Sequence, residues 1–236
     1  MTNRDDTLRA AKERAWREVA AIDQAHQRGE LDDAGWHREI AALIEPGYMA
    51  APTAEGGSGH SGSAEDWDHS RGIVAEAIDR SGTFLDIGCA NGLLMESVAA
   101  WGTARGFAVE PYGLDIVPAL AALARSRLPW WADRIFVGNA LGWRPPRRFD
   151  FVRAGLEYVP NPHRRDLVAW LLQAVVAPGG RLIFGKYNEE VHERATEHQL
   201  SAWGFAVAGR AERRHHAEPR LAYRVLWLDA PPAAAR

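Results

Sequence analysis

The sequence predicts an α/β protein: a doubly wound, mostly parallel seven-stranded sheet that ends in an antiparallel hairpin and carries an N-terminal helical appendage. Two observations lead to this fold class. From residue 83 onward, short apolar segments alternate with helical patterns, as in parallel strands joined by crossover helices. After residue 204, two further apolar segments are separated only by a short polar turn, so this pair is expected to run antiparallel.

The N-terminal part of the chain predicts helices rather than strands. Apolar residues recur at three- and four-residue steps over 4–28, which indicates an amphipathic helix. A second helix is expected over 33–44, ended by the Pro-Gly pair that follows it. A third is expected to begin at Ser63, because Ser63 and Asp66 have the spacing of a capping box.

Residues 46–63 combine two prolines, five glycines and three serines. This composition is typical of a flexible loop, and a loop of this length in a compact domain is usually functional or disordered. We therefore divide the chain into an N-terminal unit of helices and lid loop over 1–63 and a main domain over 64–236.

Seven apolar segments of the main domain have the length and composition of strands. The strands are expected at Thr83–Gly88, Tyr112–Ile116, Ile135–Gly138, Phe149–Ala154, Arg181–Gly185, Phe205–Glu212 and Leu221–Asp229. The intervening helices are expected over 92–101, from Pro118 onward, over 164–176 and over 191–203.

The composition is that of an ordinary globular protein of 236 residues, with 47% hydrophobic and 25% charged residues. No apolar run approaches the roughly 20 residues of a membrane helix, and the charged N-terminus lacks a signal region. Cys89, the single cysteine, cannot form an intrachain disulfide and is expected to fill a buried gap. These features predict a cytoplasmic protein without membrane contact.

The turn Asp86-Ile87-Gly88-Cys89-Ala90-Asn91-Gly92 lies between the first strand and its helix. In doubly wound sheets ligands bind at such strand ends, and glycines let the backbone approach a ligand closely. Asp115 falls at the end of the second strand, where a carboxylate can accept hydrogen bonds from both hydroxyls of a ribose. The alternative for Asp115 is a helix N-cap, since Pro118 follows three residues later.

Two cofactor classes use this geometry. A dinucleotide needs the spacing G-x-G-x-x-G, but the chain has Ala90 and Leu93 at the second and third glycine positions. S-adenosylmethionine (SAM) has no phosphate and needs only a tight turn past its amino-acid portion. Asp86 can order that turn or meet the ammonium group of the cofactor. The spacing therefore favours SAM.

Residues 82–229 resemble the class I SAM-dependent methyltransferase family. GTFLDIGCANG resembles its first motif, GLDI its second acidic position and VGNA its adenine-contacting segment, while FDFVRAGLEYVP and PGGRLIFGKY resemble its fourth and fifth strand motifs. The resemblance implies SAM as cofactor, bound through Asp86, Gly88, Ala90, Asn91, Gly92, Asp115, Ile116, Asn139, Ala140 and Gly155. Ala90 departs from the usual glycine, and Asn139 from the common aspartate.

Three residues of the N-terminal part are further candidates for the cofactor site. An aromatic ring of Tyr48 or Trp67 can stabilise the sulfonium by a cation–π contact, and Arg71 can pair with the cofactor carboxylate. Alternatively, Trp67 only packs its helix on the sheet.

The segment after the fourth strand is expected to face the transferred methyl group. Glu157, Tyr158 or His163 could remove a proton from the acceptor, although Tyr158 could equally shape the pocket and His163 lie on the surface. Tyr187 and Asn188, after the fifth strand, are candidates for substrate contact.

No metal site is expected. Only the histidines at positions 192, 198, 215 and 216 suggest one, and no carboxylate cluster accompanies them at ligand spacing.

The leading functional hypothesis is an enzyme that transfers a methyl group from SAM to a small molecule, with the lid closing over the site. A nucleic-acid methyltransferase is the second, because Arg144, Arg147, Arg148, Arg164 and Arg165 are expected near the mouth of the site. Protein methylation and a SAM-binding, non-catalytic partner subunit are further alternatives. The sequence leaves the acceptor atom and the oligomeric state open.

Overall fold

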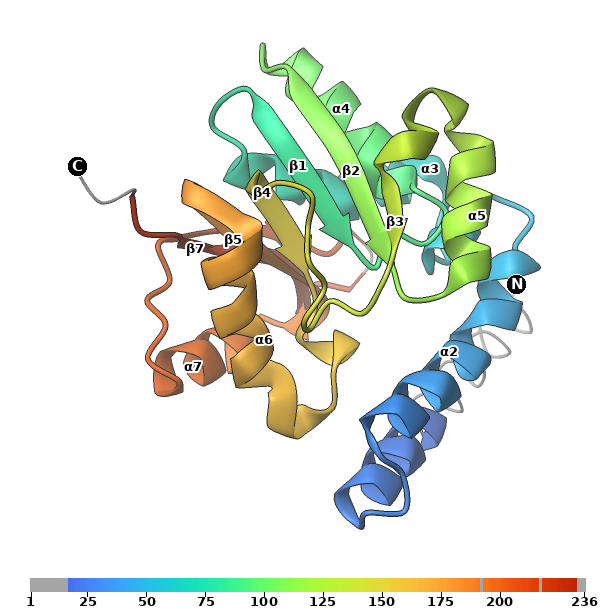
Figure 1. Ribbon diagram of the computed structural model, residues 1–236. Coiled ribbons are helices and arrows are strands. Elements are labelled where there is room, and N and C mark those ends of the chain that lie inside the picture. The colour runs from blue at the N-terminus through green and yellow to red at the C-terminus, as the bar shows by residue number, and fades with distance from the viewer. Residues whose placement is uncertain (1–16, 192, 217, 233–236) are drawn as a thin grey trace.

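The predicted fold class is confirmed by a computed structural model, which describes residues 17–191, 193–216 and 218–232 (Figure 1). Its strands form one sheet in the order β3-β2-β1-β4-β5-β7-β6. β1 to β5 pair in parallel, and β7 lies antiparallel between β5 and β6. The strands are Gly82–Ile87 (β1), Val109–Asp115 (β2), Ile135–Val137 (β3), Phe149–Ala154 (β4), Val176–Glu190 (β5), Gly209–Arg214 (β6) and Leu221–Asp229 (β7).

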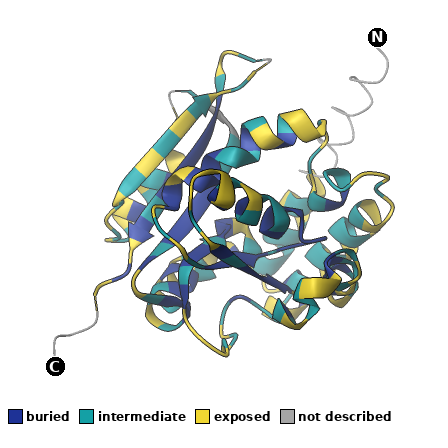
Figure 2. Cartoon of the chain, turned by 90° about the horizontal axis from the view of Figure 1, so that it is seen from above, coloured by how far each residue is buried: buried dark blue, intermediate teal, exposed yellow. Residues whose placement is uncertain are grey.

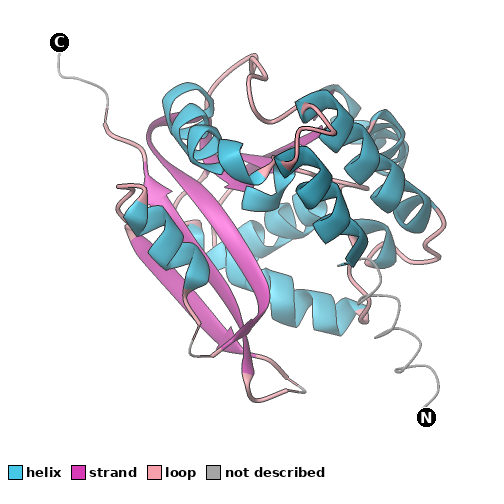
Figure 3. Cartoon of the chain, turned by 90° about the horizontal axis from the view of Figure 1, so that it is seen from below, coloured by secondary structure: helices cyan, strands magenta, loops and turns pink. Residues whose placement is uncertain are grey.

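Helices cover both faces of the sheet (Figure 3). They are α2 (Asp33–Met49), α3 (Ala64–Arg71), α4 (Leu93–Ala104), α5 (Pro118–Arg127), α6 (Arg164–Trp170) and α7 (Ala195–Ala202). Residues 17–27 are also helical, whereas the rest of the helix predicted from residue 4 lies outside the described residues. Within the described part of the chain, no helix combines the length and apolar character needed to span a membrane.

The core is divided between the two faces because neighbouring side chains of a strand point in opposite directions. On β1, Leu85 packs in the cluster that contains α6 and α7, whereas Phe84 packs with α3 and α4. On β5, Leu182 and Ile183 divide in the same way. The central strands β1, β2 and β4 are therefore buried between two helical layers, as the dark blue ribbons of Figure 2 show, whereas β6 at the edge of the sheet is not.

Helix α2 is longer than predicted. We expected it to end before the Pro46-Gly47 pair, but it continues to Met49. Proline removes one helical hydrogen bond and crowds the preceding turn. The carbonyl of Pro46 nevertheless accepts the N–H of Ala50 at 3.0 Å, and Tyr48 in the last turn lines the cavity described below. Packing in the tertiary structure thus outweighs the local preference of proline.

Strand β5 has 15 residues instead of the predicted five. The extension follows from its partner, because β7 pairs with β5 all the way from Arg181 to Glu190. The segment Pro178-Gly179-Gly180, expected to terminate a helix, lies inside β5. The helix before it ends in a π-helical turn at Val175.

The segment between α2 and α3 is attached to the turn after β1 through Asn91. The amide of Asn91 donates to the Ala54 carbonyl at 2.7 Å, and its oxygen accepts the Ser58 hydroxyl at 2.6 Å and the Leu93 N–H at 3.1 Å. A Cβ added to Gly57 would lie 2.6 Å from the Asn91 amide nitrogen. Part of the segment predicted as a flexible loop therefore forms a 3₁₀ turn, Gly56–Ser58, packed on the first turn of the sheet.

Asn91→Ala removes these three hydrogen bonds from a buried position. We expect the free energy of unfolding to fall by about 1–3 kcal/mol, because the polar groups of the turn lose their partners. Hydrogen exchange measured by mass spectrometry should accelerate over 54–60, and Ser58→Ala, which removes one bond, should show a smaller effect. Equal exchange in all three proteins would show that Asn91 does not hold the segment.

Candidate active site

A cavity of about 760 Å³ opens at the carboxyl ends of β1, β2, β4 and β5, the edge at which doubly wound sheets bind ligands. Part of its wall comes from the N-terminal helices, through Val19, Asp23, Trp36, His37, Ile40, Ala41, Ile44 and Tyr48. Trp36 is buried, and its indole N–H donates to Asp23 at 2.8 Å. This bond joins helix 17–27 to α2, so the two helices form the wall together.

The turn after β1 has three residues in the left-handed region, Gly88 (φ 72°), Ala90 (φ 48°) and Gly92 (φ 79°). Ala90 is the only residue other than glycine with positive φ in the described structure. Its Cβ makes this conformation cost about 1–2 kcal/mol. A side chain at Gly88 would collide with the ring of Tyr158, 2.7 Å from the added Cβ. Ala90 therefore departs from the usual turn in two ways: it is alanine where glycine is usual, and its backbone adopts a left-handed conformation.

Asp115 holds this turn in place. One carboxylate oxygen accepts the Ala90 N–H and the other accepts the Val117 N–H, each at 2.8 Å. The residue that caps α5 is Val117, so Asp115 is not the N-cap. Burial raises the pKa of the Asp115 carboxyl. A carboxylate accepts about four hydrogen bonds in total, and Asp115 lines the cavity, so it can accept further hydrogen bonds from a ligand.

The cavity contains a buried ion pair that the sequence analysis missed. Arg153 on β4 lies with Nη1 3.3 Å from the Asp86 carboxylate, 3.2 Å from the Ile87 carbonyl and 2.6 Å from the Tyr158 hydroxyl. Burial raises the pKa of Asp86 to about 7 despite the guanidinium. Burial also raises the pKa of Tyr158, so its phenol stays protonated at neutral pH. In the sequence, the arginine within the mostly apolar strand FDFVRA was the signal that could have indicated this ion pair.

Arg71 is a second cation of the cavity wall. Its guanidinium lies 3.5 Å from the ring centre of Tyr187 and 5.5 Å from that of Trp67. No hydrogen bond or ion pair joins Arg71 to another described residue. Burial lowers the pKa of Arg71. A half-buried cation that faces a cavity without an anionic partner is suited to an anionic group of a ligand.

Most residues predicted to bind the cofactor line this one cavity. They are Tyr48, Trp67, Arg71, Asp86, Gly88, Ala90, Asp115, Ile116, Asn139 and Ala140. Trp67 also packs α3 on the sheet, as the alternative predicted, and donates to the Ser97 hydroxyl at 2.9 Å. Three residues predicted to bind the cofactor do not line the cavity: Asn91, Gly92 and Gly155. Asn91 makes hydrogen bonds within the turn, Gly92 packs against the Leu128 side chain, and Gly155 packs against the Glu157 side chain.

The predicted catalytic and substrate residues separate into two groups. Glu157, Tyr158 and Tyr187 line the cavity, together with Arg164, which was expected near its mouth, and four residues that were not predicted there: Arg153, Lys186, Thr196 and Gln199. His163 instead faces Asp33 at 3.0 Å. Asn188 belongs to β5, but its side chain lies outside what the structure describes.

Glu157 and Lys186 form an ion pair at 3.4 Å beside this end of the cavity. Burial opposes ionisation, but the Lys186 ammonium and the Arg153 guanidinium together hold the pKa of Glu157 below its usual value. Glu157 is therefore a carboxylate at neutral pH and a weak base.

His37 of α2 reaches the segment predicted to contact adenine. Its Nε2 lies 3.4 Å from the Asn139 amide nitrogen and 3.3 Å from the Tyr158 carbonyl. The apolar spacing of Trp36, Ile40 and Ile44, four residues apart, predicts one face of a helix. The sequence analysis did not infer that this face lines the cavity.

The basic cluster predicted near the mouth of the site is mostly elsewhere. Arg147 and Arg148 precede the first residue of β4 and hence lie at the opposite edge of the sheet from the cavity. Arg147 approaches Tyr112 and Glu110 there, at 3.4 and 3.9 Å. Of the five arginines, Arg164 lines the cavity. The prediction that Arg147 and Arg148 lie near the mouth of the site, where they could meet phosphates, is therefore wrong.

The strand order, the glycine-containing turn and the acidic residue ending β2 are those of a Rossmann-like fold, and the cavity lies at the strand ends where such folds bind ligands. A family model described as a methyltransferase domain matches residues 64–227. The chain therefore belongs to the methyltransferase family, and it is a SAM-dependent methyltransferase of class I. No curated protein matches the chain.

Solved structures share this fold at low sequence identity. A 1,6-didemethyltoxoflavin-N1-methyltransferase from Burkholderia thailandensis is 16% identical with a TM-score of 0.61, over 85% of this chain and 91% of that one. The N-methyltransferase NodS from Bradyrhizobium japonicum WM9 is 18% identical with a TM-score of 0.53, over 71% and 96%. The [4+2]-cyclase SpnF is 18% identical with a TM-score of 0.50, over 69% and 80%.

The raised pKa of Asp86 predicts a pH dependence of stability. Between the unfolded value near 4 and the folded value of about 7, the folded protein holds a proton that the unfolded chain has released. The contribution of Asp86 to the free energy of unfolding therefore decreases as pH rises through this window. In Asp86→Asn this slope should be weaker by up to about 1.4 kcal/mol per pH unit.

Urea denaturation at about pH 5, 6 and 7 measures this slope. Because the amide also changes the hydrogen bond to Arg153, the slope and not the absolute stability is compared between wild type and Asp86→Asn. Asp68→Asn, on the exposed face of α3, serves as the control. Parallel slopes for wild type and Asp86→Asn would contradict the raised pKa.

Proposed function

We propose that this protein transfers the methyl group of SAM to a small molecule held in the cavity beneath the N-terminal helices. The main observation in support of this proposal is the cavity wall formed by α2 and helix 17–27, which faces the carboxyl ends of the strands. Small-molecule sites typically occupy roughly 300–1,000 Å³. A cavity of about 760 Å³ is thus suited to SAM together with a small acceptor.

The cavity has a partner for each polar part of SAM. Arg71 would pair with the carboxylate, and the turn from Asp86 to Gly92 would hold the amino-acid portion. Asp115 would accept the ribose hydroxyls, while Ile116, Asn139 and Ala140 would contact adenine. Tyr48 and Trp67 would place aromatic rings near the sulfonium.

When bound, SAM supplies a methyl group on a sulfonium, which is a good leaving group. The contribution of the protein is then mainly to hold donor and acceptor in line, an effect worth up to about 7–11 kcal/mol. Tyr158 is a poor base because burial keeps its phenol protonated. Glu157 is the remaining candidate at the acceptor end, as a carboxylate that attracts or accepts the departing proton. An acceptor that is already nucleophilic needs no stronger base.

The acceptor end also carries the cation Arg164 beside Lys186, Thr196 and Gln199. No hydrogen bond or ion pair joins the Arg164 guanidinium to another described residue, and its Nε is buried without a partner. An acceptor with an anionic or hydrogen-bond-accepting group would satisfy it.

The low-identity structural relatives include two proteins that are consistent with small-molecule methylation. One is named for the methylation of 1,6-didemethyltoxoflavin and was solved with this compound bound, and NodS is named as an N-methyltransferase. The cyclase SpnF shares the fold, so turnover of SAM has to be measured directly. We also propose that residues 1–63 act as the lid unit of this enzyme.

Asp115→Ala should weaken SAM binding by about tenfold or more, because a buried carboxylate that contacts the ribose is lost. Isothermal titration calorimetry measures the dissociation constant, and circular dichroism checks that the turn around Ala90 still folds. Asp68→Ala is the matched control, since Asp68 is exposed on α3. Unchanged affinity in Asp115→Ala would place the ribose elsewhere.

The acceptor class is tested by incubating the protein with SAM and separate pools of small metabolites, RNA, DNA and peptides. We expect S-adenosylhomocysteine to form with a small-molecule pool, and Asp115→Ala to reduce its rate. Methylation of a nucleic acid or peptide pool alone would overturn the proposed acceptor. Tight SAM binding without turnover in any pool would favour the non-catalytic partner subunit.

A further inference from the structure

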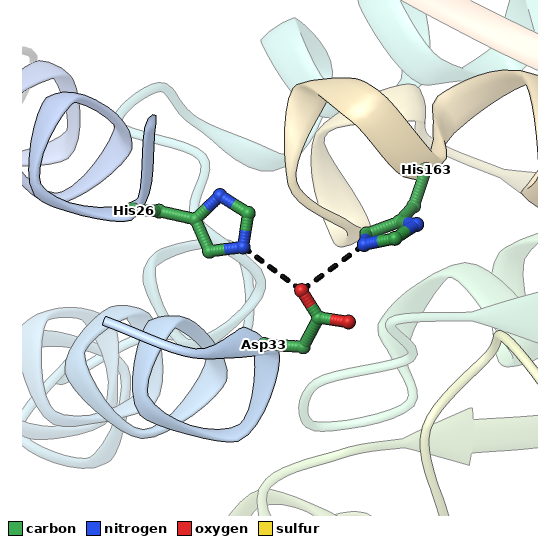
Figure 4. Close-up of side chains that lie close together, drawn as sticks. All are labelled: His26, Asp33 and His163. Carbon is green, nitrogen blue, oxygen red and sulfur yellow. Dashed lines mark hydrogen bonds and ion pairs between the residues drawn. The ribbon is translucent and has the colours of Figure 1, made fainter. Parts of the chain in front are cut away.

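The side chains of His26 and Asp33, near each other in the sequence, meet that of the distant His163 outside the cavity (Figure 4). Nε2 of His26 lies 2.8 Å and Nε2 of His163 lies 3.0 Å from the same oxygen of Asp33. His26 comes from helix 17–27, Asp33 from the first turn of α2 and His163 from the 3₁₀ turn Asn161–His163. The three residues are absent from the cavity wall, and their arrangement does not depend on the proposed function.

We propose that His26, Asp33 and His163 bind a divalent transition-metal ion, with Zn²⁺ as the representative of the class. Two imidazoles and one carboxylate are a common donor set for zinc, and three protein ligands leave a fourth position for water. The three donor atoms lie within 4.8 Å of one another. From the sequence we expected no metal site, because only histidines 192, 198, 215 and 216 suggested one and no carboxylate cluster accompanies them at ligand spacing.

Two of the three donor separations are already close to those around a bound ion, and the two imidazole nitrogens lie within 4.8 Å of each other. Ligands about 2.0–2.1 Å from zinc in a tetrahedral arrangement lie roughly 3.3 Å apart. The two distances to the Asp33 oxygen are 0.3–0.5 Å shorter than this, and both belong to hydrogen bonds that an ion would replace. The Asp33 side chain is 55% exposed and that of His163 is 32% exposed, so both have room to turn.

The site would fasten the N-terminal helices to the main domain. His26 and Asp33 lie on either side of the turn between helix 17–27 and α2, and those two helices form a wall of the cavity. His163 directly precedes Arg164, which begins α6 and lines the opposite side of the cavity. A bound ion would therefore join the two walls through three coordinate bonds.

A second histidine group provides the control. His216 lies 3.0 Å from Asp66, and its ring contacts those of His69 and His215. His215 and His216 lie in the turn between β6 and β7, and Asp66 and His69 lie on α3, so this group shares no residue or element with His26 and His163. A His216→Ala variant therefore reports whether zinc binds to exposed histidines in general.

The test is titration of the full-length, chelator-treated protein with Zn²⁺ against a chromophoric chelator, with circular dichroism to confirm folding. We expect one tight equivalent of Zn²⁺ in wild type and in His216→Ala. Loss of a direct ligand in His26→Ala or His163→Ala should weaken binding at least as much as the about 10–100-fold typical of second-shell changes. Zn²⁺ should raise the melting temperature of wild type and not of these variants.

The Asp33→Asn variant distinguishes a metal site from a cluster that is held together only by hydrogen bonds. The amide oxygen can still accept from a neutral imidazole, but it is a much poorer zinc ligand than a carboxylate. We expect the metal-free melting temperature to change little and the rise caused by Zn²⁺ to disappear. Zinc binding that is unchanged in His26→Ala, His163→Ala and Asp33→Asn, or lost in His216→Ala alone, would overturn the proposal. Absence of a tight equivalent in wild type would overturn it as well.

Discussion

The hydrogen bond from the Ala90 N–H to the Asp115 carboxylate joins the turns that follow β1 and β2. Ala90 stands in a left-handed conformation that an L-residue adopts only at a cost, and such strain persists where surrounding contacts determine it. Asp115 supplies that contact and also holds the N–H of Val117. The cofactor side of the cavity is therefore shaped by one carboxylate, whose position depends on the parallel pairing of β1 with β2.

Charge inside the cavity is arranged around two guanidinium groups with different surroundings. Arg153 is enclosed by Asp86, a backbone carbonyl and Tyr158, so its charge is matched within the protein. Arg71 has aromatic rings on its faces and no anion among the described residues. A matched buried pair shapes and rigidifies the site, whereas an unmatched cation attracts the anion of a ligand. This difference supports assigning Arg71, and not Arg153, to the cofactor carboxylate.

The N-terminal helices acquire their role through contacts that no local pattern specifies. Trp36 bonds to Asp23, His37 reaches Asn139, and Asn91 holds the segment that follows α2. These bonds join residues from 13 to 102 positions apart in the chain. The helical appendage and the sheet therefore form the cavity jointly.

The sequence by itself determined that there are seven strands, that most of them run parallel and that a glycine-containing turn follows the first, because apolar alternation and the glycine spacing around Asp86 are local signals. It also placed Asp115 and Asn139 in one site, since the carboxyl ends of neighbouring parallel strands meet. Only the tertiary structure decided the length of β5, set by pairing with β7, and the partner of Asp86, which is Arg153. The tertiary structure also decided that the His163 side chain contacts Asp33 and does not line the cavity. Such contacts depend on how distant segments pack, and local periodicity carries no information about them.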